Sequence, residues 1–347
     1  MKDHIMSRTL TELKNELEKS DFPRFRAEQL YNWFYKNTTV KLENMTNLPQ
    51  DFKSFLKKEY VFTTLTRRDI NEVKDGTLKF LWQTKEDNHL ESVLIPQNNK
   101  DNYTACLSSQ IGCNLGCKFC ASGVSGKIRD LTAGEIVEQL WQMKKYLAEY
   151  KTGDIRNIVF MGMGEPLLNY EALKNSLKIF ITDKGFDFGK RRITVSTVGI
   201  VPKIKRFADD FSQIGLAISL HSADSKIRSQ LIPINRKYSL EQLKKSLHYY
   251  NNTTGRRVTL EYIVFAGKNN SREDAKKLQE FCSGLNSHIN LLRANPVEEL
   301  EVKSTPQKKV NEFKKLLKDL GLSVSIRESR GKDKEAACGQ LRLQREE

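Results

Sequence analysis

The sequence predicts an α/β fold in which a small helical accessory domain precedes a partial (β/α)6 barrel. From about residue 100 onward, short apolar segments alternate with amphipathic segments of helical length. Near-continuous hydrophobic strands that alternate with helices are typical of a parallel sheet covered by helices. The first part of the chain shows helical periodicity instead. Six strand–helix units are too few for a closed eight-stranded barrel, so we favour an open partial barrel, with a doubly wound sheet as the alternative.

The chain begins with segments of helical character. Apolar residues at helical spacing predict three helices, over 8–19, 25–37 and 49–59. Thr9 is a typical start signal for the first of them. The sequence then changes to short stretches of alternating character, TLKFLWQT and HLESVLIP, which predict strands. We therefore expect an accessory domain over residues 1–85 and the main domain over residues 86–347.

The main domain carries six candidate strands and six candidate helices. The strands are expected at 103–109, 157–163, 191–197, 215–221, 257–265 and 288–294. The helices are expected near 132–150, 169–182, 200–208, 239–252, 271–285 and 306–320. In α/β barrels the functional groups lie at the carboxyl ends of the strands. The segments at those ends, GMGEP, ST, SLH and RANP, are therefore the first candidates for a site.

The chain is basic and carries no candidate membrane span. Lys and Arg number 58 against 43 Asp and Glu, which gives a formal net charge of +15. Such an excess attracts polyanions, so RNA or DNA is the first candidate partner, and a merely solvated surface is the plain alternative. No segment approaches the roughly 18 to 20 uninterrupted apolar residues needed to span a bilayer, and the start of the chain is polar. We expect a cytoplasmic protein without membrane contact.

Four of the six cysteines are crowded together, at Cys106, Cys113, Cys117 and Cys120. This crowding favours metal or redox chemistry over a secreted disulfide framework. Thiolates are soft ligands that suit iron–sulfur clusters or zinc, and the short spacings after Cys113 let one loop present three sulfurs to one centre. Three ligands on a four-iron cluster leave one iron open for a substrate. The alternative is a structural zinc site with Cys106 as the fourth ligand.

Several motifs together carry a specific resemblance. They are CLSSQIGCNLGCKFC, FMGMGEPLLN, RRITVSTVGIVP, LAISLHSA, PIN, INLLRANP and DKEAACGQL, in this order, between about residues 90 and 342. With these motifs the sequence is similar to the RlmN/Cfr family of radical S-adenosylmethionine (SAM) RNA adenine methyltransferases, and the helical front segment looks similar too. The resemblance implies that the partial barrel is a radical SAM core.

The resemblance also implies roles for individual residues. Cys113, Cys117 and Cys120 would hold a 4Fe–4S cluster, whose open iron binds SAM and whose electron cleaves it to a 5′-deoxyadenosyl radical. Two SAM molecules would be used per turnover. The residues implied in SAM contact are Gly164, Glu165, Ser196, Ser219, Leu220, His221 and Asn295. Without the family, GMGEP is equally typical of a tight turn, and His221 of a histidine that ends a barrel strand.

Three further residues would carry out the methyl transfer that the resemblance implies. Cys338 would accept a methyl group from one SAM, and the radical from the second would remove a hydrogen from that methyl, so that the carbon adds to adenine. Glu91 would accept the proton of the adduct, and Cys106 would form a transient disulfide with Cys338 as the product leaves. The alternatives are an exposed strand glutamate for Glu91 and a small helical or loop cysteine for Cys338.

The implied substrates are 23S rRNA and tRNA, an electron-donor reductant is a further implied partner, and we expect a monomer. The family divides into enzymes that methylate adenine at C2 and at C8. Pro166 follows Glu165 in this chain, where alanine commonly follows in C8 enzymes, so we favour C2. The alternatives are a C8 methyltransferase that gives antibiotic resistance, a zinc-dependent RNA-binding protein, and a radical SAM enzyme of another substrate class.

Overall fold

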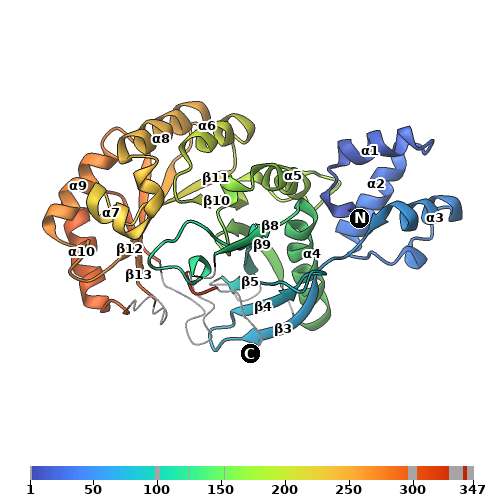
Figure 1. Cartoon of the computed structure of the whole chain (residues 1–347), viewed down its shortest axis with the longest axis horizontal. Coiled ribbons are helices and arrows are strands. Elements are labelled where there is room, and N and C mark those ends of the chain that lie inside the picture. The colour runs from blue at the N-terminus through green and yellow to red at the C-terminus, as the bar shows by residue number, and fades with distance from the viewer. Residues whose placement is uncertain are drawn as a thin grey trace.

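The computed structural model describes residues 2–97, 102–124, 126–151, 153–295, 303–327 and 339–341. Its centre is one sheet of ten strands (Figure 1). From one edge to the other, the order is β14 (Val324–Ile326), β13 (Ser287–Arg293), β12 (Val258–Val264), β11 (Gly215–Ser219), β10 (Ile193–Thr197), β9 (Asp154–Phe160), β6 (Asn102–Cys106), β5 (His89–Pro96), β4 (Leu78–Gln83) and β3 (Thr66–Glu72).

The sheet has a parallel part and an antiparallel part. From β6 to β14 in this order, every pair of neighbouring strands is parallel, whereas the pairs β3–β4, β4–β5 and β5–β6 are antiparallel. All six predicted strands of the main domain are present as β6 and β9 to β13, so the expected α/β class with an open barrel core is confirmed. The strand β14 was not predicted, because three residues are too short to show a pattern.

Helices follow the parallel strands and lie along the outside of the sheet (Figure 1). They are α4 (Ala133–Tyr150), α5 (Tyr170–Ile181), α6 (Val201–Asp210), α7 (Ser225–Leu231), α8 (Leu240–Thr254), α9 (Arg272–Cys282) and α10 (Gln307–Asp319). Capping boxes at Thr132, Ser239 and Ser271 start three of them, because each side chain accepts from the backbone of a residue that caps it in return. The sequence predicted all of these helices except the short α7. No described helix is both long and apolar enough to cross a membrane.

The front of the chain forms the expected helical module. Its helices are α1 (Leu10–Lys19), α2 (Phe25–Tyr31) and α3 (Gln50–Glu59), and residues 32–36 continue α2 as a π-helical turn. The short strands β1 (Asp3–His4) and β2 (Tyr60–Val61) pair in parallel beside them. The expected domain division between residues 85 and 86 falls between β4 and β5, which pair in the main sheet. That division stays a prediction.

Buried Glu138 on α4 joins the helical module to the main domain. Its Oε2 accepts from His4 Nε2 at 3.0 Å and from the backbone amides of Thr64 at 2.8 Å and Leu65 at 3.1 Å. His4 Nδ1 accepts from the backbone amide of Met6, so Nε2 carries the proton that it donates to Glu138. A buried carboxylate needs this number of donors, since an unpaired charge in the interior is costly.

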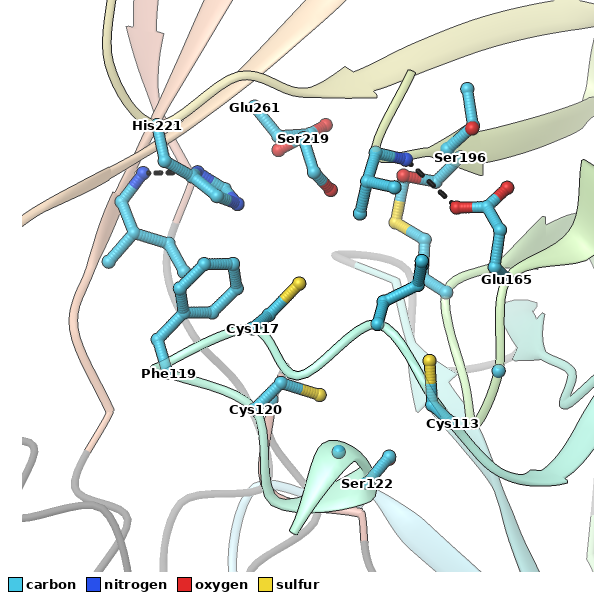
Figure 2. Close-up of a pocket in the computed structure, with 18 of the residues that line it drawn as sticks. Cys113, Cys117, Phe119, Cys120, Ser122, Glu165, Ser196, Ser219, His221 and Glu261 are labelled. Carbon is cyan, nitrogen blue, oxygen red and sulfur yellow. Dashed lines mark hydrogen bonds between the residues drawn. The ribbon is translucent and has the colours of Figure 1, made fainter. Parts of the chain in front are cut away.

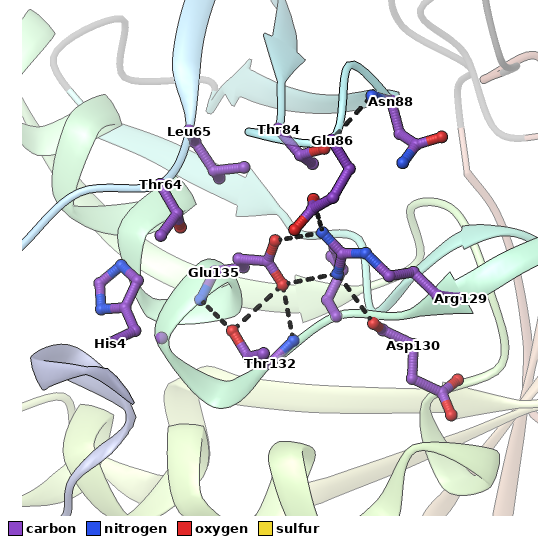
Figure 3. A network of polar contacts seen from close by, with 12 residues as sticks. His4, Thr64, Leu65, Thr84, Glu86, Asn88, Arg129, Asp130, Thr132 and Glu135 are labelled. Carbon is purple, nitrogen blue, oxygen red and sulfur yellow. Dashed lines mark hydrogen bonds and ion pairs between the residues drawn. The ribbon is translucent and has the colours of Figure 1, made fainter. Parts of the chain in front are cut away.

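A second polar network anchors the hairpin of β7 (Gln110–Gly112) and β8 (Lys127–Asp130), which the sequence did not predict (Figure 3). Arg129 on β8 donates to both carboxylate oxygens of Glu135, at 2.7 and 2.9 Å, and to Glu86 at 2.8 Å. The planar guanidinium matches a carboxylate with two parallel bonds, which fixes orientation as well as distance. The hairpin and the loop that it closes are therefore tied to the start of α4.

Candidate active site

The loop between β7 and β8 carries Cys113, Cys117 and Cys120. Gly112 begins it with φ +74°, and a Cβ there would lie 1.9 Å from the carbonyl oxygen of Gly126. The backbone amide of Cys113 donates to the same oxygen at 3.0 Å, so the two ends of the loop are closed against each other. Figure 2 shows the three cysteine side chains rising from this one loop toward the carboxyl ends of the barrel strands. The structure thus brings together the three thiols that the spacing predicted.

A pocket with about 910 Å³ of atom-free space lies between the cysteine loop and the strand ends (Figure 2). The predicted residues that line it are Cys113, Cys117, Cys120, Gly164, Glu165, Ser196, Ser219 and His221. Leu220 is fully buried, and Asn295, just after β13, is 8% exposed; neither belongs to the lining. Five of the seven residues implied in SAM contact therefore share one pocket with the thiols.

Glu165 is buried at the end of the segment that follows β9. Its Oε1 accepts from the amide of Leu167 at 3.0 Å and its Oε2 from the amide of Val198 at 2.9 Å, which ties β9 to the end of β10 (Figure 2). Burial raises the pKa of Glu165 to about 7, against the opposing effect of these hydrogen bonds. A cationic group that entered the pocket would favour the ionised form of this carboxyl.

Gly164 is required by close packing as well as by its backbone. Its φ is +95°, and a Cβ there would lie 2.5 Å from the Cβ of Gln110. Gln110 also accepts from the amide of Glu165 at 2.8 Å, so the glycine allows the strand end to approach the hairpin that closes the cysteine loop.

Gly164→Ala is expected to destabilise the protein by about 2 to 4 kcal/mol, because backbone strain and overpacking against Gln110 add. Urea unfolding of the variant measures this. Gly255→Ala is the matched control, since Gly255 has φ +65° but nothing within 4 Å of an added Cβ. It should cost only about 1 to 2 kcal/mol from strain. Equal losses of unfolding free energy in the two variants would show that the close approach to Gln110 adds nothing to the cost of Gly164→Ala.

His221 is held in a strained backbone position at the end of β11, with φ +54°. Its Nδ1 accepts from the amide of Ile263 at 3.0 Å, and its ring stands edge-on to Phe119 with 4.6 Å between centroids (Figure 2). Burial lowers the pKa of His221 to about 3, with a smaller contribution from Arg228. The ring is therefore neutral, and the bond to Nδ1 leaves the proton on Nε2 as a donor.

Arg228 on α7 is a site residue that the sequence did not single out. It is 1% exposed and donates to the carbonyl oxygens of Val198 at 2.6 Å and Ser219 at 3.3 Å. Its other Nη donates to Asn235 of the PIN motif at 3.0 Å. Burial lowers the pKa of Arg228 to about 10, and its charge acts on Cys117. One cation thus fixes the ends of β10 and β11 and faces the cysteine loop.

Glu261 on β12 lines the pocket and is a further residue that the sequence reasoning missed. It accepts from Asn290 Nδ2 at 3.1 Å, and burial raises its pKa. A glutamate inside an apolar strand has no motif around it that marks a function. Only its place in the pocket identifies it (Figure 2).

The three residues expected to handle the methyl group stand differently in the structure. Cys338 lies outside the described residues, but Gly339 lines the pocket, and its carbonyl accepts from the amide of Ala121 at 2.8 Å. Cys106 ends β6, is 5% exposed and does not belong to the lining. The C-terminal segment 339–341 is therefore docked on the turn that follows Cys120.

Glu91 on β5 is fully buried and forms an ion pair of 2.8 Å with Lys79. The alternative of an exposed strand glutamate is therefore wrong for this residue. Glu91 does not belong to the lining of the pocket. Its backbone contacts Ser108 and Met163, which connects it to the segment that carries Gly164.

The cysteine loop fits a cluster better than a single ion. Among the described residues, no group of three or more His, Cys, Asp or Glu side chains could hold one metal ion. A 4Fe–4S cluster binds each thiolate through a different iron, so its ligands stand further apart around one space. Burial raises the pKa of Cys113 to about 11 and that of Cys117 well above its usual value, so metal binding must displace their protons.

Comparison with known proteins gives the same picture along the whole chain. A model of the radical SAM superfamily matches residues 107–281, and a model of the ribosomal RNA large subunit methyltransferase N-terminal domain matches residues 5–61. The "probable dual-specificity RNA methyltransferase RlmN" of Staphylococcus saprophyticus is 41% identical over 98% of this chain and 93% of its own length. A relative of the same description from Staphylococcus aureus shows the same identity and coverage.

A solved structure agrees with these relatives. The crystal structure of a radical SAM methyltransferase from Sphaerobacter thermophilus superposes with a TM-score of 0.92 at 40% identity, and covers 98% of this chain and 99% of that one. The similarity thus includes the helical module, the sheet and the cysteine loop.

Proposed function

Because this chain belongs to the radical SAM superfamily and, within it, to the RlmN family of RNA methyltransferases, we propose that it methylates C2 of adenine in 23S rRNA and in tRNA. The observation that carries the proposal is the single pocket shared by three thiols, five strand-end residues and Gly339. Pro166 after Glu165 favours C2 over C8. The electron donor is a separate reductant, and the enzyme acts as a cytoplasmic monomer.

The pocket residues suit the cofactors that this superfamily uses. Cys113, Cys117 and Cys120 would hold a 4Fe–4S cluster, which together with SAM supplies a 5′-deoxyadenosyl radical. Glu165 accepts from the methionyl ammonium, and His221 donates from Nε2. The hydroxyls of Ser196 and Ser219 bind the ribose and carboxylate. Leu220 contacts SAM through its backbone, and Asn295 contacts it through its side-chain amide.

The affinity for SAM is expected to follow the ionisation of Glu165. The free protein has a pKa of about 7 at this carboxyl, so affinity rises as the pH rises through 7 and the carboxylate forms. Above about 8 the α-amino group of SAM loses its proton and affinity falls again. Calorimetric titration between pH 5.5 and about 9 measures the profile. In Glu165→Gln the rise in SAM affinity near pH 7 should vanish. If the rise persisted in this variant, the titrating group would be a residue other than Glu165.

The methyl group is handled by side chains of the chain itself. Cys338 accepts it from the first SAM, and the adenine adduct forms after a hydrogen atom is removed from it. Glu91, paired with Lys79 at 2.8 Å, takes the proton from C2 of the adduct. The adduct also gives up one electron to the cluster that the cysteine loop would hold. Cys106 then bonds to the sulfur of Cys338, the bond from that sulfur to the transferred carbon breaks, and the carbon takes a proton, which frees the methylated base. The reductant restores both thiols before the next round. The place of Gly339 in the pocket supports the role of its neighbour Cys338.

Cys106→Ala is expected to stall the enzyme after the adduct forms, because no thiol remains to release Cys338. Labelled RNA should then migrate with the protein on a denaturing gel. Cys282→Ala is the control, because Cys282 is an equally buried cysteine on α9 outside the pocket. It should turn over without a trapped species. Normal turnover by Cys106→Ala, or loss of its cluster, would contradict the resolving role.

Nucleoside mass spectrometry tests the proposed reaction directly. The enzyme, reconstituted without oxygen, is incubated with SAM, reductant and either hypomethylated 23S rRNA or tRNA. We expect 2-methyladenosine from both substrates. An 8-methyl product would correct the position of methylation. A product from rRNA alone would exclude tRNA as a substrate, and no methyladenosine at all would overturn the proposal. Absorbance in the sulfide-to-iron charge-transfer region separates a radical enzyme from a zinc protein.

A further inference from the structure

Four arginines from two distant parts of the sequence meet at the amino ends of the core strands. Arg191 and Arg192 precede β10, and Arg256 and Arg257 precede β12. Arg191, Arg256 and Arg257 line one hollow with the first residues of β11, and this lining contains no carboxylate. Arg191 and Arg192 also line an adjoining hollow inside the barrel, which reaches Glu261 of the reaction pocket. We call these four side chains the basic mouth.

The charges of the basic mouth are not neutralised within the described part of the chain. No described carboxylate forms an ion pair with any of the four, and Arg191 donates from its Nε to the neutral Gln213 at 3.1 Å. The buried Nε of Arg256 has no hydrogen-bond partner among the described residues. On the neighbouring helices, by contrast, Lys174 pairs with Asp210 and Arg206 pairs with Glu171.

We propose that the basic mouth binds phosphates of the RNA substrate, as a second RNA contact apart from the reaction pocket. Guanidinium forks match phosphate oxygens, and several uncompensated arginines around one hollow favour a polyanion over a neutral ligand. The inference rests on RNA being the substrate. It extends the proposed function by naming where the RNA backbone is held.

The hollow lined by Arg191, Arg256 and Arg257 shares no lining residue with the reaction pocket and lies at the opposite ends of the same strands. The reaction pocket is at the carboxyl ends, and β10 between them has 5 residues, which corresponds to roughly 17 Å at about 3.3 Å per residue. A trinucleotide, with about 3.4 Å between successive phosphates along a helix, is too short to reach both ends. A structured RNA fragment can contact both. The dependence of affinity on RNA length therefore distinguishes this site from contacts around the target adenine.

The test compares two double variants with the same loss of charge. Arg191→Gln with Arg257→Gln removes two exposed arginines of the basic mouth, and Lys308→Gln with Lys315→Gln removes two exposed lysines of α10. RNA affinity is measured against salt concentration for a structured 23S rRNA fragment and for a trinucleotide with a central adenine. Cluster absorbance and SAM affinity, measured in each variant, verify that the reaction pocket is intact.

For the structured fragment, the basic-mouth variant should lose about two units of the slope of log affinity against log salt, one for each lost phosphate contact, and bind about tenfold more weakly. The α10 variant should behave as wild type, and the trinucleotide should bind all proteins equally. Arg191→Lys with Arg257→Lys should keep most of the slope, because the charge remains.

Other outcomes would overturn the inference. An unchanged slope in the basic-mouth variant, or an equal loss in the α10 variant, would exclude a phosphate contact at this place. Binding of inorganic phosphate is measured by phosphorus NMR. If the basic-mouth variant lost phosphate binding but bound RNA as the wild type does, the hollow would be a site for a small anion instead. If the wild type bound neither RNA, the proposed function itself would fail, and this inference with it.

Discussion

Cys117→Ala is expected to lose the iron–sulfur absorbance and to reduce RNA methylation to the uncatalysed background. Cys117 lies in the centre of the loop, is 9% exposed, and packs with Leu231 and Phe265 against the strand ends. Two remaining thiols cannot hold a four-iron cluster that needs three protein ligands. Anaerobic reconstitution with iron and sulfide, followed by absorbance and methylation assays on the same sample, measures both losses.

Two other cysteine variants separate the cluster from the methyl transfer. Cys338→Ala should keep the full iron–sulfur absorbance and lose methylation, because the proposed function gives its thiol the methyl group and no iron. Cys282→Ala should keep both properties. If Cys117→Ala retained its absorbance, or if Cys338→Ala lost it, the assignment of ligands would be wrong.

The second large effect is expected from Arg228→Met. Methionine fills part of the volume but leaves the carbonyls of Val198 and Ser219 and the amide of Asn235 without their donor. Buried acceptors that lose a charged donor cost about 1 to 3 kcal/mol each, so we expect a loss of about 3 kcal/mol or more. Urea unfolding measures it. This is a large share of the roughly 5 to 15 kcal/mol that stabilises a typical domain.

A redox measurement separates the charge of Arg228 from its structural role. A cation beside Cys117 favours the more negative, reduced form of a cluster, so Arg228→Met should lower the midpoint potential in an EPR-monitored titration. Arg228→Lys keeps the charge, so it should restore the midpoint potential. It should restore less of the stability, because lysine lacks the planar guanidinium that donates several hydrogen bonds at once. Arg236→Met, at an exposed position of the next turn, should change neither quantity. An unchanged potential in Arg228→Met would leave only the structural role.

Local patterns were sufficient for most of the fold. The six strands from β6 to β13 that belong to the barrel were predicted because each is an apolar run followed by an amphipathic helix. Their ends were less well defined, since the predicted strand 157–163 stops at Phe160 in the structure. The glycines that follow take the chain out of the strand, and Gly164 has a positive φ. Hydrophobicity continues there while the backbone direction changes.

The candidate site was predicted in part, and the missed residues share a cause. Three residues separate Cys113 from Cys117 and two separate Cys117 from Cys120, so the sequence itself brings the thiols near one centre. Arg228 and Glu261 are ordinary polar residues in a helix and a strand. Only the packing of α7 brings Arg228 to the carbonyls of Val198 and Ser219 behind the pocket, and only the place of β12 puts Glu261 into its lining. The π-helical turn after α2 lies within the predicted helix 25–37, whereas the β7–β8 hairpin was missed because its strands of 3 and 4 residues are too short to show a pattern.

The sequence by itself determined which elements form and which loop carries the three cysteines, because periodicity, capping and short spacing act over a few residues. The tertiary structure decided what those elements share. It placed Glu165, His221 and Gly339 around the cysteine loop, paired Glu91 with Lys79 in the interior, and gathered four arginines from before β10 and before β12 into one mouth. Burial and charge at each of these places arise from segments that only the folded sheet brings together.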